Sequence, residues 1–190
     1  MNLLNFDEVM LVPCGTRADK PGVSPSEHRL KMVQLAVKDF FSSDFPVSVN
    51  DVEVRNGPMI MTYGLINQLQ SEADASDQQG PSETKTQYYF VLGSDLVPGL
   101  HTWKEGKSLI ENTACVVIHR RGVGSLSDQE LLDHANYPKK EPIHINVEDS
   151  IIGIVSSSEV RRRISAIPYC NRTDLGINGL VTPGVLGYIK

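Results

Sequence analysis

Short apolar segments alternate along this chain with longer segments of helical character. Each apolar segment is only long enough for a strand and ends near a Pro, a Gly or a polar turn. Strands are predicted at residues 8–12, 47–54, 88–92, 114–118 and 143–147. Helices are predicted at residues 26–41, 63–70, 108–112, 128–134 and 183–190, with Ser26 and Thr182 as N-caps and Pro183 as the first residue of the last helix. This alternation predicts an α/β fold built on a doubly wound, mostly parallel sheet.

The size and composition indicate one globular domain. The chain has 190 residues, of which 40% are hydrophobic and 22% charged, enough for one sizeable core. We therefore predict a single domain over residues 1–190. The segment 71–86 differs from the rest, because it is rich in Ser, Asp, Gln and Glu and has almost no apolar residues. We predict that this segment is a disordered insertion loop.

Charge and hydropathy argue against several classes of protein. A formal net charge of -5 does not suit binding to nucleic acid through neutralised phosphates. No apolar run approaches the roughly 20 residues of a membrane span, and residues 1–6 lack the basic region of a signal peptide. The widely spaced Cys14, Cys115 and Cys170 fit neither a zinc motif nor a disulfide framework. We expect Cys115 to be a buried thiol and the protein to be intracellular, either cytoplasmic or nuclear.

Polar and charged residues gather where the predicted strands end. Residues 13–20 follow the first strand, residues 93–95 follow the strand at 88–92, and residues 120–122 follow the strand at 114–118. In a doubly wound sheet, ligands bind beyond the carboxyl ends of the strands. We therefore expect Lys20, Asp95 and the Arg120–Arg121 pair to lie near a ligand.

A run of three serines at residues 156–158 follows another apolar segment. It follows the apolar residues 151–155 and precedes a charged segment in which Val160 and Ile164 have helical spacing. The first amides of a helix are unpaired and its N-terminus is electropositive, so this end, with Arg161 one turn in, suits an anion such as a nucleotide phosphate. The alternative is an ordinary capping box with Ser156 as N-cap and Glu159 as its partner.

Other candidate residues also have two interpretations. Asp95 could cap a turn or face a ligand, and Gly93 favours the second because a ribose or a base can approach a glycine backbone closely. Trp103, in a polar context, could stack on a ligand ring or be a partly buried structural residue. Arg120 and Arg121 could contact a phosphate or form a solvated turn. His101 and His119 have no evident partner, and isolated histidines are more often structural than catalytic.

Six segments, in order along the chain, resemble one known family. They are Asp7–Pro13 (a D-E-V-x-L-V-P strand), Ser26–Met32 (S-x-x-x-R-x-x-M), Phe90–Asp95 followed by Trp103 (G-x-D and a tryptophan), Val116–Gly122 (a strand ending in R-x-G), Val155–Arg161 (I-S-S-T-x-I/V-R, with Ser158 for Thr) and Leu180–Ile189 (L-V-P-x-x-V-x-x-Y-I). Together they resemble the nicotinamide/nicotinate mononucleotide adenylyltransferases of the nucleotidyltransferase α/β phosphodiesterase superfamily, which have a Rossmann-like fold. The serine motif alone is shared with pantetheine-phosphate adenylyltransferases and other relatives, which stay as an alternative.

This resemblance implies transfer of AMP from ATP to nicotinamide or nicotinate mononucleotide, with release of pyrophosphate and formation of NAD or deamido-NAD. It implies ATP binding by Gly93, Asp95, Ser156, Ser157, Ser158 and Arg161. It implies mononucleotide binding by Trp103, Thr102, Lys20 and Arg121. Mg²⁺ would be carried by the ATP phosphates, so no separate metal site is expected.

One expected motif does not occur in the sequence. Members of the family begin with a strand and the pattern G-x-F-x-P-x-H-x-G-H, whereas none of the five histidines here precedes Gly-His. We therefore expect the first βα unit to be missing and identify no catalytic residue. A nucleotide-binding protein with impaired catalysis, as a truncated isoform or pseudoenzyme, is an alternative hypothesis. The exposed strand edge that the missing unit would leave predicts marginal stability or a homo-oligomer.

Overall fold

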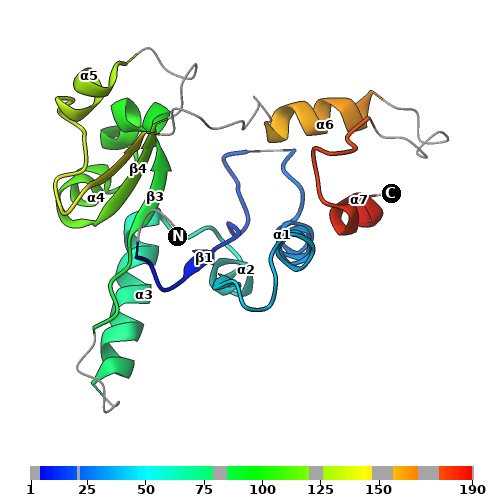
Figure 1. Ribbon diagram of the computed structural model, residues 1–190, viewed down its shortest axis with the longest axis horizontal. Coiled ribbons are helices and arrows are strands. Elements are labelled where there is room, and N and C mark those ends of the chain that lie inside the picture. Colours follow the sequence, from blue (N-terminus) through cyan, green and yellow to red (C-terminus); the bar gives the residue numbers. More distant parts are fainter. Residues whose placement is uncertain are drawn as a thin grey trace. The chain divides into compact units, whose positions relative to one another are not determined.

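The computed structural model describes residues 5–20, 22–78, 85–119, 126–146, 156–166 and 176–189. Over these ranges the chain forms two compact units, one made of Met1–Ile60 with Ile152–Lys190 and the other of Met61–Ile151. Each unit has strands with helices around them (Figure 1). The single-domain assignment stays a prediction.

The first unit contains a two-stranded parallel sheet. Strand β1 (Val9–Leu11) pairs with β2 (Val47–Val49) in the register Val9↔Val47 and Leu11↔Val49. Helix α1 (Ser26–Phe40) connects them, and helix α2 (Val52–Asn56) follows β2. Helices α6 (Ser157–Ser165) and α7 (Pro183–Ile189) complete this unit. A strand, a helix and a parallel strand in this order form the βαβ unit that the alternating pattern predicted.

Helix α7 packs against α1 through a polar contact at each end. The Gly184 amide donates to the Asp39 carboxylate over 2.6 Å, and His28 Nδ1 lies 2.6 Å from the Tyr188 hydroxyl. Because Asp39 lies in the last turn of α1 and Gly184 in the first turn of α7, the two helices run in opposite directions, side by side in Figure 1.

The second unit contains a three-stranded parallel sheet in the order β3-β4-β5. Its strands are β3 (Phe90–Gly93), β4 (Cys115–His119) and β5 (Ile143–Asn146). Around them lie α3 (Thr62–Asp77), the 3₁₀ helix η1 (Ser94–Thr102), α4 (Gly106–Asn112) and α5 (Asp128–Leu132). The mostly parallel α/β prediction is confirmed, since every strand pair among the described residues is parallel.

Strand β4 is the centre of the second unit's core. Cys115, Val116 and Val117 are all at most 2% exposed, so both faces of the strand are covered. This explains why the strand reads as an unbroken apolar run rather than an alternating one. Burial raises the pKa of the Cys115 thiol to about 12, and the prediction that Cys115 is a buried thiol is confirmed.

Three expectations about elements need correction. Residues 47–54 are not one strand, because the Asn50 side chain accepts a hydrogen bond from the Val52 amide and the chain turns into α2. Ser26 is the first residue of α1, with Pro25 at the N-cap. Residues 71–77 are not a loop, since α3 continues to Asp77. The part of the predicted loop at 79–84 lies outside the described residues.

The extension of α3 has a local cause. Side-chain hydrogen bonds with helical spacing join Gln68 to Glu72 and Gln70 to Asp74, each over 2.9 Å. Such i,i+4 pairs stabilise the polar C-terminal part of α3, whereas its N-terminal part packs Tyr63 and Ile66 against the core. No Gly or Pro occurs in the sequence from Leu65 to Gln79, so nothing ends the helix before Asp77.

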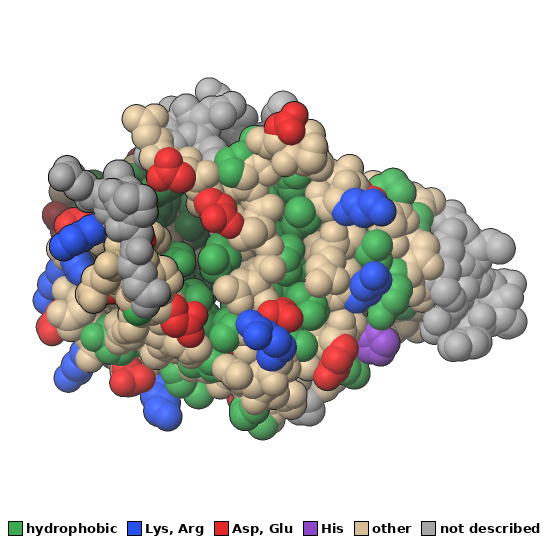
Figure 2. Space-filling view, turned by 90° about the horizontal axis from the view of Figure 1, so that it is seen from below, with side chains coloured by type: hydrophobic (Ala, Val, Ile, Leu, Met, Phe, Trp, Pro, Cys, Tyr) green, Lys and Arg blue, Asp and Glu red, His purple; other side chains and the backbone are tan. Residues whose placement is uncertain are grey.

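The described helices include none that is long and apolar enough to cross a membrane. On the face drawn in Figure 2, the Lys and Arg side chains of the described residues are interspersed with Asp and Glu. This mixed distribution accords with the negative net charge of the sequence and differs from the clustered basic surface of a nucleic-acid-binding face.

Candidate functional site

The three serines lie at the N-terminus of α6, as predicted. Ser156 is the N-cap, in an extended conformation, and its hydroxyl accepts a hydrogen bond from the Glu159 amide over 3.2 Å. Ser157 and Ser158 are the first two residues of the helix, and all three serines are exposed. The helix itself supplies no acceptor for the amides of Ser157 and Ser158, so this end is open to an anion from solvent.

The second half of the predicted capping box does not form. Instead of turning back to Ser156, the Glu159 carboxylate accepts hydrogen bonds from Arg162 over 2.8 and 2.7 Å and from Arg163 over 2.8 Å. These hydrogen bonds, first that from Arg162, lower the pKa of Glu159 to about 2. Glu159 therefore stays ionised and is shared by the two arginines that follow Arg161, so that it offsets one of their two positive charges.

Arg161 is left as the available cation at this helix end. Its guanidinium reaches back one turn and donates to the Ser158 hydroxyl over 3.3 Å. Of the three consecutive arginines, it is the one without a carboxylate within 4 Å among the described residues. A helix N-terminus, three hydroxyls and an uncompensated guanidinium form an arrangement suited to binding phosphate oxygens.

In the second unit, Gly93 and Asp95 lie at the carboxyl end of β3. Gly93 is the last residue of the strand, paired with Ile118 of β4, and Asp95 belongs to the first turn of η1. The Asp95 side chain is exposed, while its neighbour Ser94 is buried. The carboxylate is therefore at the edge of the sheet where doubly wound folds bind ligands.

Trp103 follows η1, and part of its ring packs against the protein core. It packs against the core cluster of the second unit, with its ring edge-on to Phe90 at a centroid distance of 6.4 Å. The ring is only partly buried, so the two interpretations of Trp103 are compatible. The neighbouring Thr102 hydroxyl donates to the Gly99 carbonyl over 2.7 Å and so closes the last turn of η1.

Lys20 lies in the loop after β1 and lines a pocket of about 320 Å³. Two other cations line this pocket but have partners: Arg17 forms an ion pair with Asp19 at 2.6 Å, and Arg29 donates to the Gly15 carbonyl over 2.6 Å. Lys20 forms no ion pair within 4 Å among the described residues. The lining also includes the carboxylate of Glu27, so three cations and one anion line the pocket, and Lys20 is a cation that is not held by another group among the contacts described.

The predicted residues thus occur as groups within each unit. Ser156, Ser157, Ser158 and Arg161 are together at the N-terminus of α6. Gly93, Asp95, Thr102 and Trp103 are on β3, on η1 or directly after η1. Arg120 and Arg121 lie outside the described residues, directly after β4. The assignment of these residues to ATP and to the mononucleotide stays a prediction.

The five histidines all have local partners. His28 contacts Tyr188, His101 lies 3.1 Å from the Pro98 carbonyl, and His134 accepts from the Asn136 amide over 3.1 Å. The expectation that His101 and His119 have no partner was wrong for both: His101 also lies 2.7 Å from the Asn136 side-chain amide, and His119 and His144 both lie against Asp128. Sequence reasoning missed this group. The available signal was that two predicted strands, consecutive along the chain, each carry a histidine.

Comparison with known proteins agrees with the fold and with the ordered segments. Residues 1–163 match the Cytidylyltransferase-like family. A probable nicotinate-nucleotide adenylyltransferase of Dehalococcoides mccartyi (strain CBDB1) is 30% identical over 194 residues, which cover 100% of this chain and 82% of the relative. The corresponding protein of Borreliella burgdorferi is 27% identical, with 99% and 81% covered.

Solved structures give the same result. The Plasmodium falciparum nicotinic acid mononucleotide adenylyltransferase complexed with NaAD is similar with a TM-score of 0.72 and 25% identity, over 99% of this chain and 83% of that one. The Rossmann-like nucleotidyltransferase fold is thereby confirmed. The chain belongs to the nicotinate-nucleotide adenylyltransferases of the Cytidylyltransferase-like family.

Proposed function

We propose that this protein transfers AMP from ATP to nicotinate mononucleotide, forming deamido-NAD and pyrophosphate. The names of the relatives from Dehalococcoides and Borreliella support the nicotinate substrate. Nicotinamide mononucleotide would undergo the same reaction to give NAD. The observation that carries the proposal is the N-terminus of α6, where Ser156 caps the helix and Arg161 has no carboxylate within 4 Å among the residues that the structure describes.

The reaction needs no covalent intermediate on the protein. An oxygen of the mononucleotide phosphate attacks the α-phosphorus of ATP, and the bond from that phosphorus to the oxygen leading to the β-phosphorus breaks. Pyrophosphate then leaves with the electron pair of the broken bond. Positioning the two phosphates in line and offsetting the charge on their oxygens are the contributions a protein makes to such a step.

The residues at the α6 N-terminus suit the triphosphate. The amides and hydroxyls of Ser157 and Ser158 donate to phosphate oxygens, and the Arg161 guanidinium adds charge-assisted hydrogen bonds. In the second unit, Gly93 and Asp95 bind the ribose of the adenosine, with the carboxylate accepting from ribose hydroxyls. The exposed position of Asp95 beside a glycine supports this role.

The mononucleotide is bound by Trp103, Thr102, Lys20 and Arg121 in this proposal. The partly exposed Trp103 ring stacks on the pyridine, and Thr102 lies beside it in the chain. Lys20 and Arg121 supply positive charge to the mononucleotide phosphate. The available ammonium group of Lys20 in its pocket supports this assignment.

Mg²⁺ would enter with ATP, held by the phosphate oxygens. Among the described residues, the side chains placed closely enough to hold a metal are His119, Asp128 and His144, and Mg²⁺ prefers oxygen ligands to imidazole. Because these imidazole-containing side chains do not suit Mg²⁺, we expect the ATP phosphates, rather than the protein, to hold it. When bound, Mg²⁺ offsets the negative charge that builds on the phosphates.

Replacing Arg161 with Ala tests the proposal. Hydrogen bonds to charged groups contribute about 1.5–3 kcal/mol, so R161A should lower kcat/KM by roughly 10- to 100-fold. Pyrophosphate release would be measured from the full-length protein with ATP, Mg²⁺ and either mononucleotide. The matched control is R162A, on the same helix, which removes an arginine already paired with Glu159 and should change kcat/KM less than about twofold.

Other outcomes have clear meanings. Equal losses in R161A and R162A would contradict the special role of Arg161. Binding of ATP without any pyrophosphate release would contradict the enzymatic function and support a nucleotide-binding protein that lacks catalysis. Release with pantetheine phosphate as acceptor, and with neither mononucleotide, would assign the protein to a different branch of the family.

A further inference from the structure

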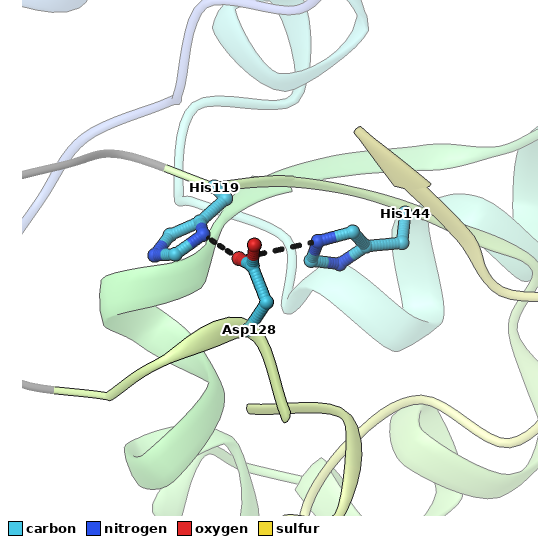
Figure 3. A group of neighbouring side chains, drawn as sticks. All are labelled: His119, Asp128 and His144. Atoms are coloured by element: carbon cyan, nitrogen blue, oxygen red, sulfur yellow. Dashed lines mark ion pairs between the residues drawn. The ribbon is translucent and has the colours of Figure 1, made fainter. Parts of the chain in front are cut away.

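Two histidines and an aspartate converge beside strands β4 and β5 of the sheet in the second unit. His119 is the last residue of β4, His144 lies on the neighbouring strand β5, and Asp128 is the first residue of α5. Figure 3 shows both imidazole rings pointing at the Asp128 carboxylate from opposite sides. None of these residues belongs to the binding groups proposed above.

The atoms that meet here are those that ligate metals. Asp128 Oδ1 forms an ion pair with His119 Nδ1 and lies 3.7 Å from His144 Nε2. The three potential ligand atoms all lie within 4.8 Å of one another. All three are buried, and none makes a hydrogen bond of ordinary geometry. Buried nitrogen and oxygen atoms rarely lack hydrogen bonds, so the arrangement calls for an explanation.

The other polar atoms of the cluster are held by neighbouring side chains. Asn146 Nδ2 donates to Asp128 Oδ2 over 2.6 Å, which leaves Oδ1 to face the two rings. The Tyr137 hydroxyl lies 3.3 Å from His144 Nδ1, which leaves Nε2 to face the carboxylate. Such outer contacts, which fix the orientation of imidazole and carboxylate ligands, typically accompany metal sites in proteins.

The backbone around Asp128 is also fixed. Ser127 caps α5 in a full capping box, in which its amide donates to Glu130 over 2.8 Å and its hydroxyl accepts from the Glu130 amide over 3.3 Å. The two histidines are on paired parallel strands, in the register His119↔Asn146. All three candidate ligands are therefore positioned by regular secondary structure.

We propose that His119, Asp128 and His144 bind a divalent transition-metal ion such as Zn²⁺. Two imidazoles and one carboxylate suit Zn²⁺ and its neighbours in the first transition row, whereas Mg²⁺ and Ca²⁺ prefer oxygen ligands. The side chains of His119 and His144 are 12% and 20% exposed, but Asp128 is 43% exposed. The ion can thus enter from solvent and keep a water molecule as its fourth ligand.

Zn²⁺ titration of the full chain, made metal-free with a chelator, tests the site. Calorimetry should show one saturable site, and Zn²⁺ should raise the melting temperature because it binds the folded state. H119Q and D128N should each weaken Zn²⁺ binding more than 100-fold. Y137F, which removes only the outer contact of His144, should weaken it roughly 10- to 100-fold. The control H28Q changes an exposed histidine of the other unit and should bind like the wild type.

Co²⁺ provides a test that does not depend on the folding of variants. In the wild-type protein it should give the intense visible absorption of a tetrahedral ion, without the thiolate charge-transfer band that binding to a cysteine would add. The absence of a saturable site would overturn the proposal and show the group to be an ion-pair network. Unchanged Zn²⁺ affinity in folded H119Q and D128N, a loss of binding in H28Q, or a thiolate band would overturn it equally.

Discussion

At the scale of single residues, the loop after β1 depends on the smallest side chain. A Cβ atom at Gly15 would lie 2.7 Å from the carbonyl oxygens of Glu53 and Gly57 and 2.8 Å from the Pro58 carbonyl carbon. All three are backbone atoms, which cannot rotate away as a side chain would. The loop that carries Lys20 therefore requires glycine here.

G15A should destabilise the protein by about 1–3 kcal/mol, the usual cost of forcing extra atoms into a packed site. Urea denaturation would measure the change in the free energy of unfolding. G99A is the control, because a Cβ at Gly99 would meet nothing within 4 Å. Equal stability of G15A and the wild type would show that the contact around Gly15 relaxes without cost.

Glu53 is a buried carboxyl in the same region, only 3% exposed, and accepts a hydrogen bond from the Gly15 amide over 2.8 Å. Burial raises its pKa above the usual 4.5, although the hydrogen bonds from the Gly15 and Ile60 amides oppose this. Between the unfolded and folded pKa values, the native state binds more protons than the unfolded state. The stability that Glu53 contributes through its raised pKa is thus fully present below about pH 4.5. It is lost as the pH rises through the folded pKa.

E53Q removes this titration, so stability relative to the wild type should increase as pH rises from about 4.5. The absolute stability of E53Q should be lower by about 1 kcal/mol, because the substitution replaces one accepting carboxylate oxygen with an NH₂ group that can only donate. Urea melts of the two proteins at a series of pH values would give the difference. A difference that stays constant with pH would contradict the raised pKa.

At the scale of elements, α7 is short and depends on α1 for its first turn. Its Gly184 amide has the Asp39 carboxylate as acceptor, in place of the local side-chain cap that most helices have. The carboxylate also faces the positive end of the helix. One side chain of α1 therefore holds the start of a helix that lies far along the sequence.

D39A should lower stability by about 0.5–2 kcal/mol, the range for losing an N-terminal cap. Hydrogen exchange of the α7 amides should accelerate, while that of β4 should not change. D44A, which removes a nearby exposed carboxylate bonded only to Ser43 at 3.3 Å among the described residues, is the control. Unaltered α7 exchange in D39A would show that apolar packing alone fixes this helix.

Elements were predictable from sequence where the signal was local. The run that became β4 is apolar because both faces of that strand are covered. The run that became β3 was predictable from its β-prone residues, although Val91 is 53% exposed. Pro183 begins α7, where its missing amide costs nothing. The chain at 47–54 was misread because Asn50 supplies a turn that hydropathy does not show. Residues 71–77 were misread because side-chain pairs, not burial, stabilise that part of α3.

The candidate sites show the same division. The N-cap role of Ser156 and the backward reach of Arg161 involve residues within one or two turns, so the sequence predicted both. The choice of Glu159 between Ser156 and the arginines depends on competing side-chain contacts, which sequence spacing does not resolve. Asp128 and its two histidines meet only because β4 and β5 pair in parallel.

At the scale of the whole molecule, the buried apolar residues are unevenly divided. Most of the described core belongs to the second unit, around Leu92, Val97, Leu100, Leu109 and Val117. The first unit contributes Val52, Ile177 and Val185 to the buried set. Since burial of apolar area is the main favourable term in folding, the two units should differ in their resistance to opening.

We predict that the first unit opens at a lower free energy than the second. Native-state hydrogen exchange at increasing urea concentrations would report the opening free energy of each segment. Amides of β1, β2 and α1 should exchange through a smaller opening that leaves β4 protected, and β4 should exchange only on global unfolding. Adding ATP with Mg²⁺ should slow exchange at the start of α6, since a ligand that binds only the closed form stabilises it. If the opening free energies of β1 and β4 instead follow the same urea dependence without ligand, the two units unfold as a single cooperative structure. The uneven distribution of the core then has no consequence for opening.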